Sequence, residues 1–352
     1  MCGYASSDRP AFKGGLLALL AAALFGVSTP LVQKLGHGLG PFTTAALLYA
    51  GAALVGWLLR RPAEHEARVL RTDLPRLLAV AFFGAVVGPV AMAWGLQRTS
   101  GAGASLMLTL EALFTAVLAW RLYGETMDRR VWSAVLLLLA GGLSLVLEQG
   151  RGGGSQLLGL IAVMVATAAW GMDNTLSRAL AERDPGQVVL AKAILGVMAT
   201  TCLAWLTGEP WPGVGATAGL LMVGATGYGL SLRFYLLAQR EFGAARTGSV
   251  FAFAPFIGAT LALVLGDRSG GWGLVLGGAL MLLGVIVHLA ESHEHEHQHE
   301  ALAHEHAHSH DDGHHDHVHD PMPSGPHSHA HHHDPVRHTH AHAPDVHHGH
   351  KH

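Results

Sequence analysis

The chain has 352 residues, of which half are hydrophobic and only 13% are charged, and 45 are glycines. So apolar and glycine-rich a composition excludes an ordinary soluble domain and is typical of a protein that crosses a membrane many times. The formal net charge of −3 combines two unlike parts, because Lys and Arg are in excess before residue 291 and Asp and Glu are in excess from Glu291 onward.

Ten apolar runs follow one another along the chain, each near the length that crosses a bilayer core of about 30 Å. Charged and turn-forming residues separate them, for example Arg60-Arg61-Pro62 and Asp184-Pro185-Gly186. We therefore expect an all-α membrane protein with ten transmembrane helices. The short connections predict that neighbouring helices pack antiparallel. The runs cover residues 11–35, 41–59, 75–96, 101–121, 130–148, 155–180, 187–207, 214–238, 243–266 and 271–290.

Ten spans place both ends of the chain on the same side of the membrane. The distribution of Lys and Arg predicts which side this is. With a cytoplasmic N-terminus, fourteen Lys and Arg residues fall on the inner side and four on the outer side. We therefore expect a multi-pass protein of the cell (inner) membrane with both termini in the cytoplasm. The first apolar run is too long for the hydrophobic region of a signal peptide, so we expect it to remain as a helix.

One carboxylate, Glu111, lies in the middle of the fourth apolar run. An ionised group in hydrocarbon costs on the order of 2.5 to 3.5 kcal/mol on insertion scales, so we expect it to face a cavity or a partner. Burial could raise its pKa toward neutrality, so Glu111 could take up and release a proton. The plainer alternative is a neutral acid that forms a hydrogen bond between helices.

The segment that contains Glu111 has a counterpart in the second half of the chain. A shift of 142 residues aligns Gly266 with Gly124 and Asp267 with Glu125. The first helices of the two halves also match, because Phe25-Gly26 aligns with Trp170-Gly171 at a shift of 145. Each unit has an odd number of spans, so the second copy must be inverted, as is usual in secondary transporters with a site at the repeat interface.

Leu110-Glu111, Phe114 and the closing Gly124-Glu125 resemble the fourth helix of EamA-type proteins of the drug/metabolite transporter superfamily. The resemblance implies a transporter rather than an enzyme, with ten helices in two inverted five-helix repeats. This chain has Ala112 where many relatives have a proline. The expected division is a cytoplasmic segment (1–10), a first repeat (11–148), a Gly-rich linker (149–154), a second repeat (155–290) and a disordered His-rich cytoplasmic tail (291–352).

Other polar residues in the spans have competing interpretations. Asp173 could pair with Arg178 or contact a substrate. Arg233 needs Glu111, Glu241 or a substrate anion, unless it extends to the inner interface, as we expect for Lys192. Aromatic residues could line a pocket, although many only pack or anchor helices. The predicted substrate pathway is Glu111, Asp173, Asn174, Arg178, Arg233, Trp94, Trp170, Tyr228 and Phe251.

Prolines and glycines within the spans indicate where helices bend or approach closely. Pro30, Pro89 and Pro255 each remove a backbone hydrogen bond, so they are candidate gating bends or tolerated kinks. The pairs Gly84 with Gly88 and Gly224 with Gly227 allow close helix contacts.

The tail is rich in histidine: of 27 histidines in the chain, all but His37, His65 and His288 lie between His293 and His352. It has no apolar periodicity, so we expect disorder. Imidazole suits Zn, Ni, Co and Cu, so we expect these ions on the tail, unless it is low-complexity sequence without a role. The predicted ligands are His293, His295, His297, His299, His304, His306, His308, His310, His314, His315, His317 and His319.

Together these features predict a secondary transporter, an exporter of a small organic metabolite by alternating access, with a tail that binds or senses metal. It requires no cofactor, and the absence of a GxxxxGK motif argues against ATP drive. The alternatives are a transporter of a divalent transition metal (Zn, Ni or Co) or its chelate, and a metal sensor or storage protein without transport. Expected partners are the small-molecule substrate, the lipid bilayer and transition-metal ions, with no nucleic acid; the oligomeric state stays open.

Overall fold

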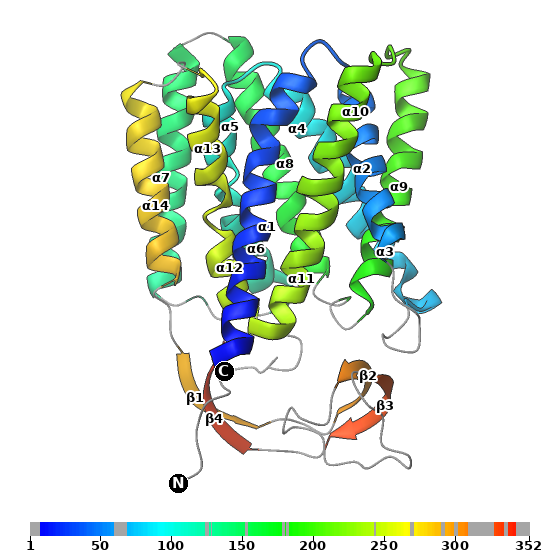
Figure 1. The fold of residues 1–352 in the computed structure, drawn as a ribbon. Helices are drawn as coiled ribbons and strands as arrows, with labels where there is room; N and C mark the ends of the chain where they lie inside the picture. Colours follow the sequence, from blue (N-terminus) through cyan, green and yellow to red (C-terminus); the bar gives the residue numbers. More distant parts are fainter. Residues whose placement is uncertain are drawn as a thin grey trace.

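The computed structural model describes residues 8–59, 69–123, 127, 129–151, 154–177, 180, 183–242, 244–267, 271–289, 293–298, 302–308, 327–333 and 337–342. These residues form a bundle of ten helical spans with short strands below one end (Figure 1). The ten predicted spans are therefore confirmed.

The first five spans form one half of the bundle. They are α1 (Asp8–Leu35); α2 (Pro41–Leu58); a third span of η1 (Arg71–Asp73), α3 (Leu74–Ala81), η2 (Phe82–Val87) and α4 (Gly88–Leu96); a fourth of α5 (Gly101–Met107) and α6 (Leu110–Tyr123); and α7 (Arg129–Arg151). The other five are α8 (Gly154–Ser177); α9 (Pro185–Leu206); an eighth span of α10 (Val214–Val223), η4 (Gly224–Leu230) and α11 (Ser231–Phe242); a ninth of α12 (Ala244–Phe251) and α13 (Ala254–Val264); and α14 (Trp272–Leu289).

Eight of the described spans are long and apolar enough to cross a membrane by themselves. The ninth and tenth contain shorter apolar helices, Ala254–Val264 and Trp272–Val287. The ninth span differs from the single run predicted at 243–266, because Pro255 is the second residue of α13 and has no N–H for a continuous helix.

The two halves share the same backbone irregularities. The third helix of each half contains a π-helical turn, η2 in the first and η4 in the second. The fourth helix of each half is interrupted, after Met107 in one and after Phe251 in the other. The two halves therefore resemble each other in sequence and also in the positions of their π-helical turns and helix interruptions.

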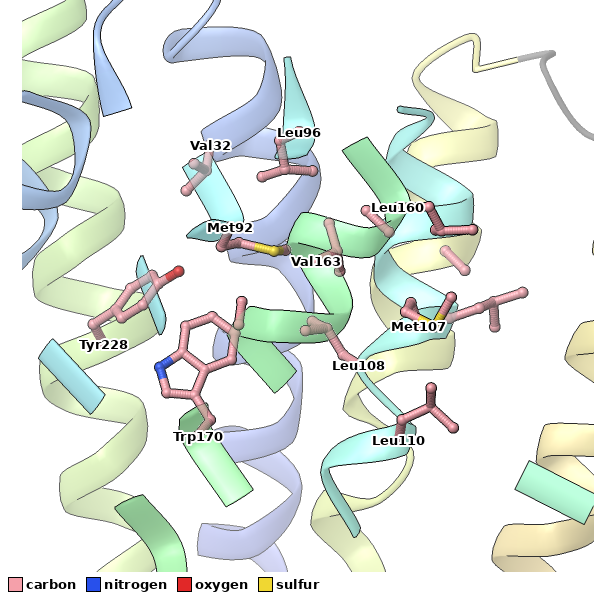
Figure 2. Packing of buried hydrophobic residues seen from close by; sticks show 14 of the residues in the cluster. Val32, Met92, Leu96, Met107, Leu108, Leu110, Leu160, Val163, Trp170 and Tyr228 are labelled. Carbon is pink, nitrogen blue, oxygen red and sulfur yellow. The ribbon is translucent and has the colours of Figure 1, made fainter. Parts of the chain in front are cut away.

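Packing between the halves is reciprocal. Helix α1 packs on η4 and α11 of the second half, while α8 packs on η2 and α4 of the first. In the same way α2 packs on α9, α5 on α13 and α7 on α14. Such reciprocity is what a two-fold relation between two copies requires. Buried side chains from both halves, including Val32, Met92, Val163 and Tyr228, meet in one apolar cluster at the centre (Figure 2).

Four segments of the tail form strands that the sequence analysis does not predict. Strand β1 (His293–Gln298) pairs antiparallel with β4 (Arg337–His342), and β2 (Leu302–His308) with β3 (His327–His333). Alternation of histidine with other residues has the period of two that a strand requires. The strands and the start of α1 lie at the same end of the bundle (Figure 1), below called the N-terminal end.

Candidate functional site

Glu111 lies immediately after the interruption of the fourth span, as the second residue of α6. Here the backbone N–H groups of Leu108 and Thr109 donate to carbonyls three residues back, at 3.2 and 3.0 Å. The Thr109 hydroxyl also donates to the Leu106 carbonyl at 2.8 Å. These tight-turn bonds interrupt the helix without a proline at position 112.

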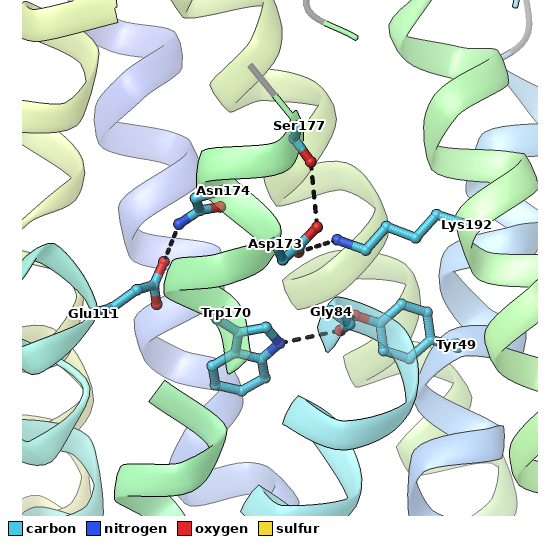
Figure 3. Close-up of polar contacts among 8 residues, drawn as sticks. All are labelled: Tyr49, Gly84, Glu111, Trp170, Asp173, Asn174, Ser177 and Lys192. Atoms are coloured by element: carbon cyan, nitrogen blue, oxygen red, sulfur yellow. Dashed lines mark hydrogen bonds and ion pairs between the residues drawn. The ribbon is translucent and has the colours of Figure 1, made fainter. Parts of the chain in front are cut away.

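Glu111 forms a contact between the two halves. Asn174 Nδ2, from α8, donates to Glu111 Oε1 at 2.5 Å (Figure 3). The Glu111 side chain is half-buried and Asn174 is exposed. Glu111 and Asn174 therefore form a polar contact between the two repeats, from α6 to α8.

Asp173 and Lys192 form an ion pair inside the interface. Lys192 Nζ contacts Asp173 Oδ2, and the two residues are only 7% and 4% exposed. The prediction that Lys192 extends to the membrane surface is wrong, because Gly84 on η2 leaves room for both charged groups: a Cβ at Gly84 would collide with them. Arg178, which the sequence suggested as the partner of Asp173, lies outside the described residues.

The carbonyl oxygen of Gly84 joins three helices near this ion pair. It accepts hydrogen bonds from the Tyr49 hydroxyl and from Trp170 Nε1, the latter at 3.1 Å (Figure 3). A π-helical turn disrupts the regular backbone pattern and is frequently found at functional sites. Gly84 thus connects α2, η2 and α8 through one backbone atom, a role that the sequence alone does not reveal.

Aromatic rings from both halves gather beside these polar groups. The Phe25 ring centroid lies 6.0 Å from that of Trp170, 6.1 Å from Tyr228 and 5.5 Å from Phe251. The Tyr49 ring lies 5.7 Å from Tyr228. We call these five residues the aromatic cluster. The structure thus brings together the predicted Trp170, Tyr228 and Phe251, and adds Phe25 and Tyr49, which sequence reasoning missed.

Two further predicted pathway residues, Trp94 and Arg233, each have a described contact away from Glu111. The guanidinium of Arg98 lies 3.7 Å from the centre of the Trp94 ring and donates to the Trp94 carbonyl at 2.9 Å. Arg233 Nη1 donates to the carbonyl of Leu59, at the end of α2, at 3.0 Å. Neither contact involves Glu111.

The three candidate gating prolines lie at different kinds of position. Pro30 is inside α1, Pro89 is the second residue of α4 directly after η2, and Pro255 is the second residue of α13. Pro89 therefore lies next to the π-helical turn η2, and Pro255 lies next to the interruption of the ninth span. Their role in gating stays a prediction.

The end of the bundle opposite the N-terminal end is joined by bonds between the repeats. Glu209 accepts from Thr43 N at 2.7 Å, and Asp267 accepts from Ala102 N at 3.0 Å. A cavity of about 230 Å³ lies there, with Lys34, Asp267 and Pro30 among the residues that line it.

Within the described part of the chain, no three His, Cys, Asp or Glu residues gather to form a potential metal site. The side chains of the tail histidines, including the twelve predicted ligands, lie outside that part. Metal binding by the tail therefore stays a prediction.

Comparisons with known proteins place this geometry in a family. The profile of the EamA-like transporter family matches residues 12–147 and 157–290, close to the predicted repeats. An uncharacterized transporter of Methanothermobacter thermautotrophicus is 26% identical over 300 residues, which cover 78% of this chain and 85% of the relative. The uncharacterized transporter YdeK of Bacillus subtilis is 29% identical over 277 residues, covering 75% and 92%.

A solved structure, described only as a crystal structure of a protein, has the same fold. Its TM-score is 0.57 at 19% identity, and the match covers 78% of this chain and 94% of the other. The family profile, in contrast, matches both halves and most of the sequence. The chain belongs to the EamA-like transporter family of the drug/metabolite transporter superfamily, and it is a multi-pass membrane transporter rather than an enzyme.

Proposed function

We propose that this transporter exports a small organic metabolite by alternating access, with Glu111 as the coupling group. The observation that carries the proposal is the hydrogen bond between Glu111 on α6 and Asn174 on α8. It joins the two inverted repeats, whose relative rocking gives alternating access in transporters of this build.

A change of protonation at Glu111 would act directly on this contact. A hydrogen bond to an ionised carboxylate is roughly twice as strong as one between neutral groups. Proton uptake by Glu111 therefore weakens its bond to the Asn174 amide and lets α6 and α8 separate. Proton release restores the bond and favours the arrangement described here.

The neighbouring side chains suit an organic substrate. Binding sites for small molecules combine apolar and aromatic walls with a few polar groups. The aromatic cluster and the polar groups of Glu111, Asn174, Asp173 and Lys192 supply both kinds of surface, from both repeats.

We assign the N-terminal end of the bundle to the cytoplasm, because the excess of Lys and Arg falls on that side. The histidine-rich tail is then cytoplasmic, and we propose that it binds or senses Zn, Ni, Co or Cu ions beside the transporter. Its interleaved histidines and acids support this role.

Replacing Glu111 by glutamine tests the proposal. Glu111→Gln keeps the size of the side chain but cannot release a proton, so we expect metabolite export to be abolished. The measurement is metabolite profiling of medium from cells with and without the protein, at two zinc levels, followed by flux of the identified compound in vesicles.

The matched control is Glu209→Gln, which changes a carboxylate that accepts from the start of α2 at the opposite end of the bundle. We expect this variant to keep its export. Undiminished export by a well-expressed Glu111→Gln variant would contradict the coupling role.

A further inference from the structure

The cavity at the outer end of the bundle lies close to the aromatic cluster. The outer end is the one opposite the N-terminal end, which the proposed function assigns to the cytoplasm. The cavity, of about 230 Å³, lies where the ends of α1 and α13 approach the start of α5 (Figure 1). In α1, Pro30 lines it and Phe25 of the cluster precedes Pro30 by a rise of roughly 7.5 Å. In the ninth span, Phe251 of the cluster likewise precedes Ala262 of the cavity. The cavity is therefore on the outer side of the cluster.

Three helices meet closely between the cluster and the cavity. A Cβ added to Gly258 of α13 would lie 2.7 Å from the Gly26 carbonyl oxygen of α1 and 2.9 Å from Ser105 Oγ of α5. A Cβ added to Gly26 would in turn collide with the Ala254 carbonyl oxygen of α13. Small residues let helix backbones approach this closely. The contact leaves no space for a substrate, so it separates the cluster from the cavity.

Ser105 is buried at this contact without a hydrogen-bond partner for its hydroxyl. The residue is 0% exposed, and its Oγ has no partner among the described residues. Buried polar groups almost always have a partner, because leaving one unpaired costs the free energy of its desolvation. An alanine would occupy the same place without this cost. We therefore expect the hydroxyl to find its partner in another conformation, in which α5 and α13 are apart.

Asp267 bonds the end of α13 to α5 at the edge of the cavity. Gly266, with a φ of 96°, ends α13, and Asp267 N donates to the Ala262 carbonyl at 3.0 Å, which fixes the backbone of Asp267. Asp267 Oδ2 accepts from Ala102 N, at the start of α5, at 3.0 Å. Because α13 belongs to the second repeat and α5 to the first, this bond joins the two repeats at the outer end.

Lys34 makes a second bond across the same edge. Its Nζ, at the end of α1, donates to the Leu265 carbonyl, at the end of α13, at 3.1 Å. Each of the two bonds joins a charged side chain to a backbone group beside the cavity. Water competes for such groups, so the net free energy of each bond is small. These bonds can therefore break and form again during a transport cycle.

We propose that the contact of Gly26, Ser105 and Gly258 is the outer gate of the transport pathway, and that Asp267 holds this gate closed. In the open state α13 moves away from α1 and α5, and the bond between Asp267 and Ala102 breaks. The cavity then joins the aromatic cluster, and the Ser105 hydroxyl lines the passage. The inference rests on the proposed alternating-access function and adds the residues that control release to the outside.

The reactivity of a cysteine at position 105 tests the gate. Full-length protein with Cys2→Ser, Cys202→Ser and Ser105→Cys is expressed in intact cells, which are treated with a membrane-impermeant maleimide. Asp267→Ala removes the acceptor for Ala102 N, and the loss of one such bond changes the open population by about fivefold. We therefore expect Asp267→Ala to make labelling from outside about fivefold faster.

The matched control is Glu148→Ala. Glu148 Oε1 also accepts from a backbone group of the other repeat at the outer end, since Gly271 N donates to it at 2.5 Å, but this bond joins α7 to α14. We expect its removal to leave the labelling rate unchanged. An equal acceleration by Glu148→Ala, or no acceleration by a well-expressed Asp267→Ala variant, would overturn the proposal.

Cross-linking tests the gate without removing the contact. In the background without native cysteines, Ala102→Cys and Asp267→Cys are joined by a short bifunctional methanethiosulfonate. We expect metabolite export to stop and to resume after reduction. The same treatment of Glu148→Cys with Gly271→Cys should leave export unchanged. Export that continues while positions 102 and 267 are cross-linked would contradict the assignment of the gate.

These experiments separate the inference from the proposed function. If Asp267→Ala leaves labelling unchanged while Glu111→Gln abolishes export, the outer gate is wrong and the coupling role stands. If Glu111→Gln exports normally while Asp267→Ala, but not Glu148→Ala, accelerates labelling, the coupling role is wrong and the outer gate stands.

Discussion

Gly84 contributes to the site in two ways. Its missing side chain admits Asp173 and Lys192, and its carbonyl accepts from Tyr49 and Trp170. The first property needs glycine, whereas the second needs only the backbone of the π-helical turn. A larger residue at position 84 would therefore disturb the Asp173–Lys192 ion pair more than the hydrogen bonds to its carbonyl.

We predict that Gly84→Ala destabilises the protein by about 1–3 kcal/mol, the usual cost of overpacking a close contact. The new methyl group would displace Asp173 and Lys192, so transport should also fall. The measurement is thermal unfolding in detergent together with flux.

Gly215→Ala is the matched control, because Gly215 lies in α10 and a Cβ there has nothing within 4 Å. Because Gly215 is the second residue of α10, its expected effect is a gain smaller than the roughly 0.5–1 kcal/mol of a glycine in a helix interior. Equal unfolding temperatures for the two alanine variants would show that Gly84 is not tightly packed.

The fourth and ninth spans are both interrupted, but different residues cause the two interruptions. In the fourth span, Thr109 and the tight-turn bonds before Glu111 interrupt the helix. In the ninth, Pro255 removes a backbone donor next to the interruption. Both interruptions lie where the two repeats meet, since α5 packs on α13.

We predict that Pro255→Ala slows transport about tenfold, equivalent to about 1.4 kcal/mol on a barrier, because it allows α12 and α13 to form a more continuous helix. The Tm should not fall, since alanine favours helix. Flux and Tm measured on the same preparation check both parts.

Pro41→Ala serves as the control, since Pro41 is the first residue of α2, where proline is well tolerated. This variant should transport normally. A Pro255→Ala variant with wild-type flux would count against a gating role for this bend.

On the scale of the whole molecule, the bundle and the tail differ in composition and charge. The tail carries an excess of acidic residues and almost all the histidines, while the bundle carries an excess of basic residues. If the tail buffers or senses metal beside an organic-substrate carrier, the two parts should be separable. If the bundle transports metal ions that the tail concentrates, removal of the tail should change transport.

We predict that removal of residues 291–352 leaves metabolite export intact and abolishes the binding of several Zn, Ni or Co ions per protein. Titration calorimetry of the purified proteins measures binding, and medium profiling measures export. Altered tolerance of cells to Zn, Ni or Co, with no exported organic compound, would instead support the metal-transport alternative.

Much of the fold could be predicted because membrane spans are local features. Each apolar run satisfies its own backbone bonds within hydrocarbon, so its existence depends on its own residues. The repeat was also visible in residue pairs such as Phe25-Gly26 and Trp170-Gly171. The strands of the tail were not expected, because a strand depends on pairing with a distant segment.

The sequence by itself determined the ten spans, their duplication and the importance of Glu111, since a lone acid among apolar residues is unusual wherever its neighbours lie. Only the tertiary structure decided that Lys192 turns inward to Asp173, and that Gly84 joins Tyr49 and Trp170. The direction of a long side chain depends on the space left by helices distant in the sequence. Here Gly84, which has no side chain, leaves that space.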